Sequence, residues 1–338
     1  MANPCEVEVL NNALSGIGVD EKSLVSILTK SQNERKKSMR KGCSKFFLED
    51  ERQFERWNDS AIKSLKAEFK LFKDVVVLSL MHPWERDARL LKKALKKGPP
   101  HYNVIVEIAC TRSSDQLLGA RKAYHSLFDR SIEEDLTSHV KGSERKVHPS
   151  FFTHLYILNL FCCGIIRFMC CFEQLLVALV SAYRYEGPKV KEDAAKSEAK
   201  ALLNAIKNNN GDHKKKAMEE DEVIWILTTR SKPHLKVVYE QYKKISAKTI
   251  TEDLEVELLL KETLECLCTP QTYFTRVFDT ALREDAKEDA KKALTRLVAT
   301  QEDVDLKGIA AKFEDKIKER VKGAYKDVLL GVLADERK

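Results

Sequence analysis

Apolar and aromatic positions return along this chain in one repeated register. Each copy has a Thr, an apolar residue six positions on, and an aromatic residue seven positions beyond that. The copies are Thr111, Leu117 and Tyr124; Thr229, Leu235 and Tyr242; and Thr300, Leu306 and Phe313. Residues seven apart lie about two helical turns apart and share one face, so the register predicts a buried helical stripe in every copy. A fixed repeat of this kind indicates an array of similar helical units.

Two further features extend the repeat. In two copies the Thr is followed by Arg-Ser, and Thr29-Lys30-Ser31 begins a degraded first copy. The segments Val140-Lys141-Gly142 and Val321-Lys322-Gly323 also resemble each other. After the second of them the chain runs directly into an apolar helix. After the first, 28 residues from Val147 to Gln174 intervene, and removing them brings the two copies into register.

The intervening stretch, residues 147–174, is almost wholly apolar in its middle and has three interpretations. A membrane span is long enough, since about 20 apolar residues cross a bilayer, but Arg167 would be costly at depth. A structural insertion must leave the preceding helix at Pro149, because proline bars simple continuation. A retained intron has suitable ends, since Val codons begin with GT and Gln codons include CAG. We favour the retained intron and leave the other two open.

Composition supports an all-α protein. The chain has 338 residues, a third of them charged and only 12 of them glycine, which suits long helices with solvated faces. Its formal charge of +7 arises from 59 basic and 52 acidic residues, so the charge is unevenly distributed and favours anionic partners at particular places.

Other classes of function find little support in the sequence. The first residues carry no basic and apolar segments of a secretory signal, so we expect a cytoplasmic protein whose nine cysteines are reduced. The histidines and cysteines form no metalloenzyme or thiol-hydrolase motif, and catalysis is not expected. No groove-reading or base-stacking module is recognisable, so nucleic acid is not an expected partner.

Several segments together resemble annexins, and the plant annexins in particular. Residues 14–21 resemble the annexin calcium loop, 68–81 the fourth-helix segment of the first repeat, 82–88 the start of a second repeat, and 224–242 the middle of a third. The resemblance implies a curved disc of four repeats, each of about five helices, with the fourth repeat shortened. It implies repeat boundaries at 5–81, 82–186 (interrupted by 147–174), 192–268 and 270–335.

The first repeat holds the candidate calcium site. Calcium prefers six to eight oxygen ligands, and Gly16 and Gly18 allow a tight turn that aims backbone carbonyls inward. The resemblance implies the carbonyls of Leu14, Gly16 and Gly18 as ligands, with Asp74 as the distant carboxylate. Ile17 would lie at the tip of the loop, where it can enter the membrane interface. Val19 replaces the usual Thr, and the segment between the loop and Asp74 is longer than is usual in the family.

The other three loops depart from the calcium pattern. Lys97 and Pro99 stand where the second loop would have glycines, residues 205–216 lack the Gly-x-Gly turn, and residues 283–287 lose both glycines. We therefore expect at most one calcium site of the family type. Lysines now stand in these regions, and Lys96, Lys97 and residues 214–216 are candidates for direct contact with lipid phosphates.

These features predict a cytoplasmic protein that binds peripherally at the plasma membrane or another anionic membrane. Calcium is the expected cofactor and anionic phospholipid the expected partner, with lysines contributing without calcium. The alternative is a calcium-independent helical scaffold that binds protein partners such as cytoskeletal filaments. The sequence gives no oligomeric state.

Overall fold

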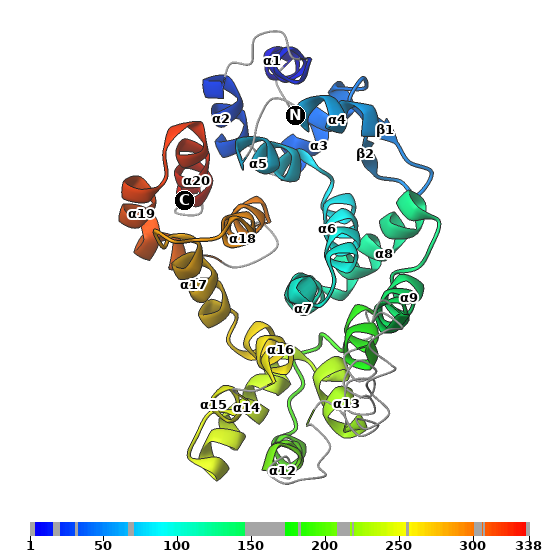
Figure 1. The fold of residues 1–338 in the computed structure, drawn as a ribbon, viewed down its shortest axis with the longest axis vertical. Helices are drawn as coiled ribbons and strands as arrows, with labels where there is room; N and C mark the ends of the chain where they lie inside the picture. Colours follow the sequence, from blue (N-terminus) through cyan, green and yellow to red (C-terminus); the bar gives the residue numbers. More distant parts are fainter. Residues whose placement is uncertain are drawn as a thin grey trace, which may run out of the picture. The chain divides into compact units, whose positions relative to one another are not determined.

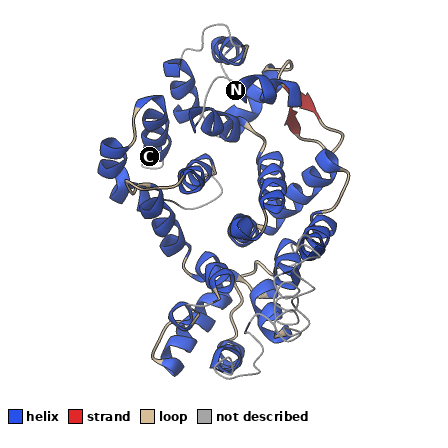
Figure 2. Ribbon diagram, in the orientation of Figure 1, coloured by secondary structure: helices blue, strands red, loops and turns tan. Residues whose placement is uncertain are grey.

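The fold is taken from a computed structural model of the chain, shown in Figure 1. The structure describes residues 4–15, 21–30, 33–66, 71–145, 173–181, 184–207, 217, 220–254, 257–300, 306 and 308–335. These residues are helical apart from turns, loops and one short hairpin, which confirms the all-α prediction (Figure 2). Among them no helix is both long enough and apolar enough to cross a membrane. Most of the apolar stretch 147–174 lies outside the described residues.

The chain divides into two compact units, one of Met1–Arg86 with Gln271–Lys338 and the other of Asp87–Pro270. The elements of the first unit are α1 (Pro4–Leu14), α2 (Glu21–Lys30), α3 (Asn33–Gly42), β1 (Phe47–Glu49), β2 (Glu55–Trp57), α4 (Asp59–Lys66), α5 (Leu71–Leu80), α17 (Pro270–Ala281), α18 (Glu288–Ala299), α19 (Ile309–Arg320) and α20 (Gly323–Asp335). Only two residues separate α19 from α20.

The first unit joins the two ends of the chain around α5. The sequence of α5 is apolar at most positions, as expected of a helix buried on several sides, and it packs against α2, α18 and α20. Helix α2 also packs along α20. A Cβ at Gly331 of α20 would collide with the side chain of Thr29, so the glycine permits this close approach.

An antiparallel hairpin, β1–β2, lies between α3 and α4 and was not predicted from the sequence. Phe47 pairs with Trp57, and their ring centroids are 4.5 Å apart. Both rings are buried. Such an aromatic pair across two strands stabilises the hairpin in addition to the effect of the buried apolar area. The hairpin lies in the segment between the first loop and Asp74.

The elements of the second unit are α6 (Pro83–Lys97), η1 (Pro99–His101), α7 (Tyr102–Thr111), α8 (Ser114–Phe128), α9 (Ile132–Arg145), a helix over residues 173–180, α12 (Glu192–Lys207), α13 (Asp221–Thr229), α14 (Lys232–Ser246), α15 (Ile250–Asp253) and α16 (Leu258–Cys268). The boundary between the units falls within α6. In this unit α12 packs against α14, and α7 packs against α16.

The repeated register marks core positions, as predicted. Its apolar and aromatic members are all at most 3% exposed: Leu117, Tyr124, Leu235, Tyr242, Leu306 and Phe313. The two tyrosines also donate their hydroxyls to carboxylates eleven residues further on, Tyr124 to Asp135 at 2.5 Å and Tyr242 to Asp253 at 2.7 Å. These hydrogen bonds satisfy the polar groups of the two buried tyrosines. Phe313, at the same place in the third copy, has no hydroxyl to satisfy.

Candidate functional site

The candidate calcium loop lies between α1 and α2. Helix α1 ends at Leu14, whose side chain is buried. Ser15 follows in a turn, and its hydroxyl donates to the Asn11 carbonyl at 2.6 Å. Carbonyls in the last turn of a helix have no intrahelical partner, so the Leu14 carbonyl is available as an oxygen ligand. The predicted ligands Gly16 and Gly18, and the loop tip Ile17, lie outside the described residues.

Asp74, the predicted carboxylate ligand, lies in the first turn of α5 and is half-buried. Its charge acts on two groups of the first unit. The pKa of Lys292 is raised, mainly by its hydrogen bond to Glu288 and less by Asp74, and the pKa of Tyr325 is raised to about 12, mainly by burial.

The loop of the second repeat follows α6 and differs from a calcium turn. Lys96 and Lys97 are exposed in the last turn of α6, where positive charge interacts favourably with the helix dipole. Gly98 then has φ +84°, and the short helix η1 begins at Pro99. The left-handed Gly98 ends α6, and Pro99 and Pro100 set the backbone of the turn.

The loop of the fourth repeat contains one backbone hydrogen bond and one ion pair. The Ala286 N–H donates to the Arg283 carbonyl at 3.2 Å, and the Glu284 carboxylate lies 3.4 Å from the guanidinium of Arg320. In the third repeat residues 208–216, including the lysines at 214–216, lie outside the described residues.

Within the described residues no group of three or more His, Cys, Asp or Glu side chains is arranged to hold a metal ion.

The Thr-Arg-Ser motif joins two helices in the same way in both of its copies. Thr111 and Thr229 each donate their hydroxyl to a carbonyl four residues earlier, at 2.5 and 2.7 Å. The serines cap the next helix, because the Ser113 hydroxyl accepts the Gln116 N–H and the Ser231 hydroxyl accepts the His234 N–H. The motif is therefore a helix end followed directly by a helix start.

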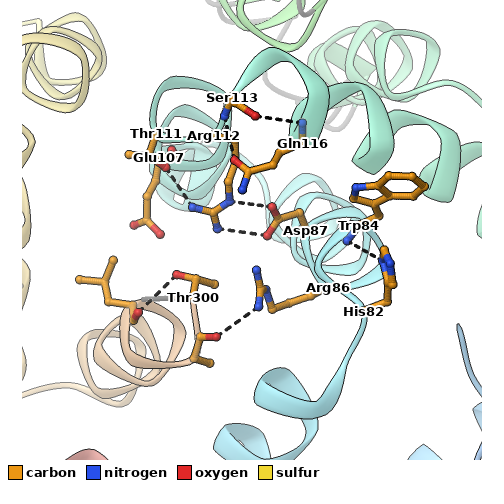
Figure 3. Close-up of polar contacts among 12 residues, drawn as sticks. His82, Trp84, Arg86, Asp87, Glu107, Thr111, Arg112, Ser113, Gln116 and Thr300 are labelled. Carbon is orange, nitrogen blue, oxygen red and sulfur yellow. Dashed lines mark hydrogen bonds and ion pairs between the residues drawn. The ribbon is translucent and has the colours of Figure 1, made fainter. Parts of the chain in front are cut away.

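The arginine of each motif pairs with a carboxylate on a preceding helix. Arg112 makes a bidentate pair with Asp87 of α6, at 2.7 and 3.1 Å, and both side chains are at most 3% exposed (Figure 3). Arg230 pairs with Glu198 of α12 at 2.5 Å, but a third of its side chain is exposed. The equivalent arginine is thus sealed in one copy and accessible in the other.

The start of α6 shows a second capping arrangement. The His82 ring nitrogen accepts the Trp84 N–H at 3.2 Å, so His82 belongs to the turn that enters α6 (Figure 3). Burial and the nearby Arg40 and Arg86 lower the pKa of His82 to about 3, so its ring is a neutral acceptor. Arg86 itself donates to the Ala299 carbonyl at 3.2 Å.

Comparison with known proteins identifies the family. Annexin D4 of Arabidopsis thaliana is 45% identical over 99% of this chain and 99% of its own length. The chain belongs to the annexin family. The annexin family model itself matches residues 86–148 and 210–259. Annexins are known for calcium-dependent binding of phospholipids and are generally not enzymes.

Solved annexins share the fold of this chain. The structure of annexin III matches with a TM-score of 0.73 and 24% identity, over 98% of this chain and 94% of that one. Calcium-bound annexin (Sm)1 matches with a TM-score of 0.67 and 17% identity, over 98% and 89% of the two chains. The family resemblance and the helical fold predicted for this annexin from its sequence are therefore confirmed.

Proposed function

We propose that this annexin binds acidic phospholipids at the membrane surface when calcium occupies the loop between α1 and α2. The observation that supports it best is the Gly16-x-Gly18 sequence, which stands between helices α1 and α2. The family is known for this activity, and one relative of the same fold, annexin (Sm)1, has been solved in a calcium-bound form. Calcium is accordingly the ligand we assign to this loop.

The residues that would hold calcium supply oxygen ligands alone. The carbonyls of Leu14, Gly16 and Gly18 and the carboxylate of Asp74 match the preference of calcium for hard oxygen donors. Such a set leaves coordination positions for a lipid phosphate, so calcium and membrane would each strengthen the binding of the other. Ile17 at the loop tip would enter the interfacial region.

Lysines add a contribution that needs no calcium. Lys96 and Lys97 at the end of α6, with residues 214–216, would face lipid phosphates at loops that lack the Gly-x-Gly turn. Each basic side chain near an anionic surface adds about 1 kcal/mol to membrane binding, and salt screens this attraction. The resulting association is peripheral, at the plasma membrane or another anionic membrane.

Co-sedimentation of the full chain with phosphatidylserine vesicles tests this function. Calcium is expected to increase binding over chelator, and Asp74→Asn is expected to weaken the calcium-dependent part at least about tenfold by removing a charged ligand. Glu68→Gln, six residues earlier, is the matched control and should bind as the unchanged chain. Lys96→Gln with Lys97→Gln should lower only the binding that persists in chelator at low salt.

Three results would redirect the assignment. Loss of calcium dependence in Glu68→Gln, with Asp74→Asn unaffected, would transfer the carboxylate role from Asp74 to Glu68. Equal binding at low and high salt in chelator would remove the role of the lysines. Absence of vesicle binding under every condition would favour the scaffold that binds protein partners such as cytoskeletal filaments.

A further inference from the structure

A pocket of about 320 Å³ lies within the unit formed by Asp87–Pro270. It opens between the linker that precedes α12 and the junction of α13 with α14. The side chains that matter here are Tyr185, Lys189, Lys191, Arg230, Ser231 and His234. No carboxylate is among the described residues that line it. Its volume is in the range of small-molecule sites.

The linker that forms one wall of the pocket is fixed by hydrogen bonds to the end of α13. The Tyr185 N–H donates to the Thr229 carbonyl at 3.1 Å. The guanidinium of Arg184 donates to the carbonyls of Leu227 and Arg230, at 2.5 and 2.7 Å. These contacts satisfy carbonyls that the end of a helix leaves without partners, and they hold the linker in place.

Gly187 is required for the conformation of this wall. A Cβ at Gly187 would collide with the ring of Tyr185, which folds over the glycine. The ring remains half exposed, so its other parts are accessible at the pocket mouth. The linker therefore presents an aromatic side chain and two lysines in a defined arrangement.

Arg230 is oriented before any ligand arrives. Its Nε lies 2.8 Å from one oxygen of Glu198, and its guanidinium lies 4.4 Å from the centre of the Trp225 ring. The other oxygen of Glu198 is 2.9 Å from the His234 ring nitrogen. The carboxylate holds both side chains from the buried side, while a third of the Arg230 side chain remains exposed. A pre-oriented guanidinium loses little entropy when it binds an oxyanion.

The two linker lysines supply unneutralised charge. Lys189 and Lys191 are exposed, and neither forms an ion pair or side-chain hydrogen bond with any residue in the described part of the chain. The N-terminus of α14 adds to the positive potential in the pocket. Ser231, which lines the pocket, is the N-cap of this helix, and helix N-termini favour anions.

Helix α8 of the second repeat corresponds to α14, and its N-terminus has an anionic group as a hydrogen-bond partner. At the start of α8, the carboxylate of Glu186 accepts the Ser114 N–H at 2.6 Å. An oxyanion from the chain itself therefore occupies the first helix start. The second helix start opens instead on the basic pocket.

We propose that this pocket binds a phosphate monoester without calcium. Lys189 and Lys191 would neutralise the dianion, and the exposed edge of Arg230 would donate paired hydrogen bonds to its oxygens. The volume suits a ligand of about the size of a sugar phosphate. This site goes beyond the calcium-dependent binding proposed above, since it uses none of the residues assigned there. The monoester can belong to a soluble small molecule or to a lipid headgroup.

The test uses the full chain in a calcium chelator with two probes that carry the same phosphate monoester. Glycerol 3-phosphate is titrated calorimetrically, and phosphatidic acid vesicles are compared with phosphatidylcholine vesicles by co-sedimentation. The variant Lys189→Gln with Lys191→Gln should weaken binding at least about tenfold, because two charge-assisted contacts are lost. The matched control is Lys196→Gln with Lys200→Gln, which removes two exposed lysines of α12 that do not line the pocket.

Each outcome decides the proposal. Binding of glycerol 3-phosphate that the linker variant loses and the control keeps supports a soluble ligand. The same pattern with phosphatidic acid vesicles alone supports a lipid headgroup. Absence of binding to both probes, or equal weakening by the linker and control variants, overturns the proposal. The chelator silences the calcium loop, and glycerol 3-phosphate presents no membrane surface to Lys96 and Lys97, so the calorimetric result does not depend on the phosphatidylserine experiment. With phosphatidic acid vesicles, only the binding that the linker variant loses is assigned to the pocket.

Discussion

The α7–α8 and α13–α14 junctions share the sequence Thr-Arg-Ser but differ in what surrounds the arginine. At the first junction Arg112 and Asp87 are sealed in the unit, and Glu186 covers the helix start. At the second, Arg230 shares Glu198 with His234 and remains partly open to a basic pocket. The motif thus caps a helix in both copies, but its arginine has a different role in each. The buried Arg112 forms a structural ion pair, whereas the partly exposed Arg230 is a candidate binding group.

The largest expected effect comes from removing the two arginines in turn. Arg112→Met leaves the buried Asp87 carboxylate without its bidentate partner and should lower the free energy of unfolding by about 3–5 kcal/mol. Arg230→Met should cost only about 1 kcal/mol, because the pair is partly solvated and Glu198 keeps its contact with His234. Urea denaturation of the full chain measures both. Equal losses would show that exposure does not separate the two junctions.

A matched variant checks the cause of the larger loss. Asp87→Leu combined with Arg112→Met removes both charges and should recover part of the stability lost by Arg112→Met alone, because no unpaired charge remains buried. If the double variant is less stable than the single one, packing around Arg112 outweighs its charge.

The same contrast applies to the tyrosine–aspartate pairs further along each repeat. Asp135 is fully buried and accepts hydrogen bonds from Tyr124, from Arg130 at 3.0 Å and from Lys92. Asp253 is only half-buried and is contacted by Tyr242 at 2.7 Å. Asp135→Asn should cost about 2–3 kcal/mol and Asp253→Asn about 1 kcal/mol of unfolding free energy. Urea denaturation of the two variants checks the order.

The pH dependence of the Asp135 pair has a defined sign. Burial opposes ionisation of Asp135, but hydrogen bonds from Lys92 and Tyr124 outweigh it and keep its pKa below the ordinary value. A lowered pKa stabilises the folded chain above the unfolded pKa, and this stabilisation is lost as the pH falls through the folded pKa. The stability difference between the unchanged chain and Asp135→Asn should therefore shrink below about pH 4. A difference that is constant from pH 7 to pH 3 would contradict the ion pair.

Much of this fold could be predicted because the repeat register records burial. The spacing from Leu117 to Tyr124, and from Leu235 to Tyr242, places side chains on one helix face, and the faces are buried as predicted. The β1–β2 hairpin could not be found this way. Its strands are three residues long, too short to show an alternating pattern.

The sites were less predictable for a physical reason. Sequence similarity drew attention to Gly16, Gly18 and Asp74, since a calcium loop has a local signature. The basic pocket has none, because Lys189 and Lys191 are far from Arg230 along the chain and meet it only through the fold. The Thr-Arg-Ser register was visible in the sequence, but its acid partners on α6 and α12 required the structure.

The smallest expected effects come from replacing the capping serines of the two Thr-Arg-Ser motifs. These variants distinguish the capping role of the serine from a role in ligand binding. Ser113→Ala removes half of a reciprocal capping box, in which Gln116 also accepts the Ser113 N–H at 2.9 Å. Ser231→Ala removes a single cap at 3.3 Å. Each should cost about 1 kcal/mol of unfolding free energy, with the larger loss at Ser113. Because Ser231 lines the basic pocket, only Ser231→Ala should also weaken glycerol 3-phosphate binding, measured by calorimetry in chelator. If the two variants change binding equally, the α14 start does not take part in the pocket.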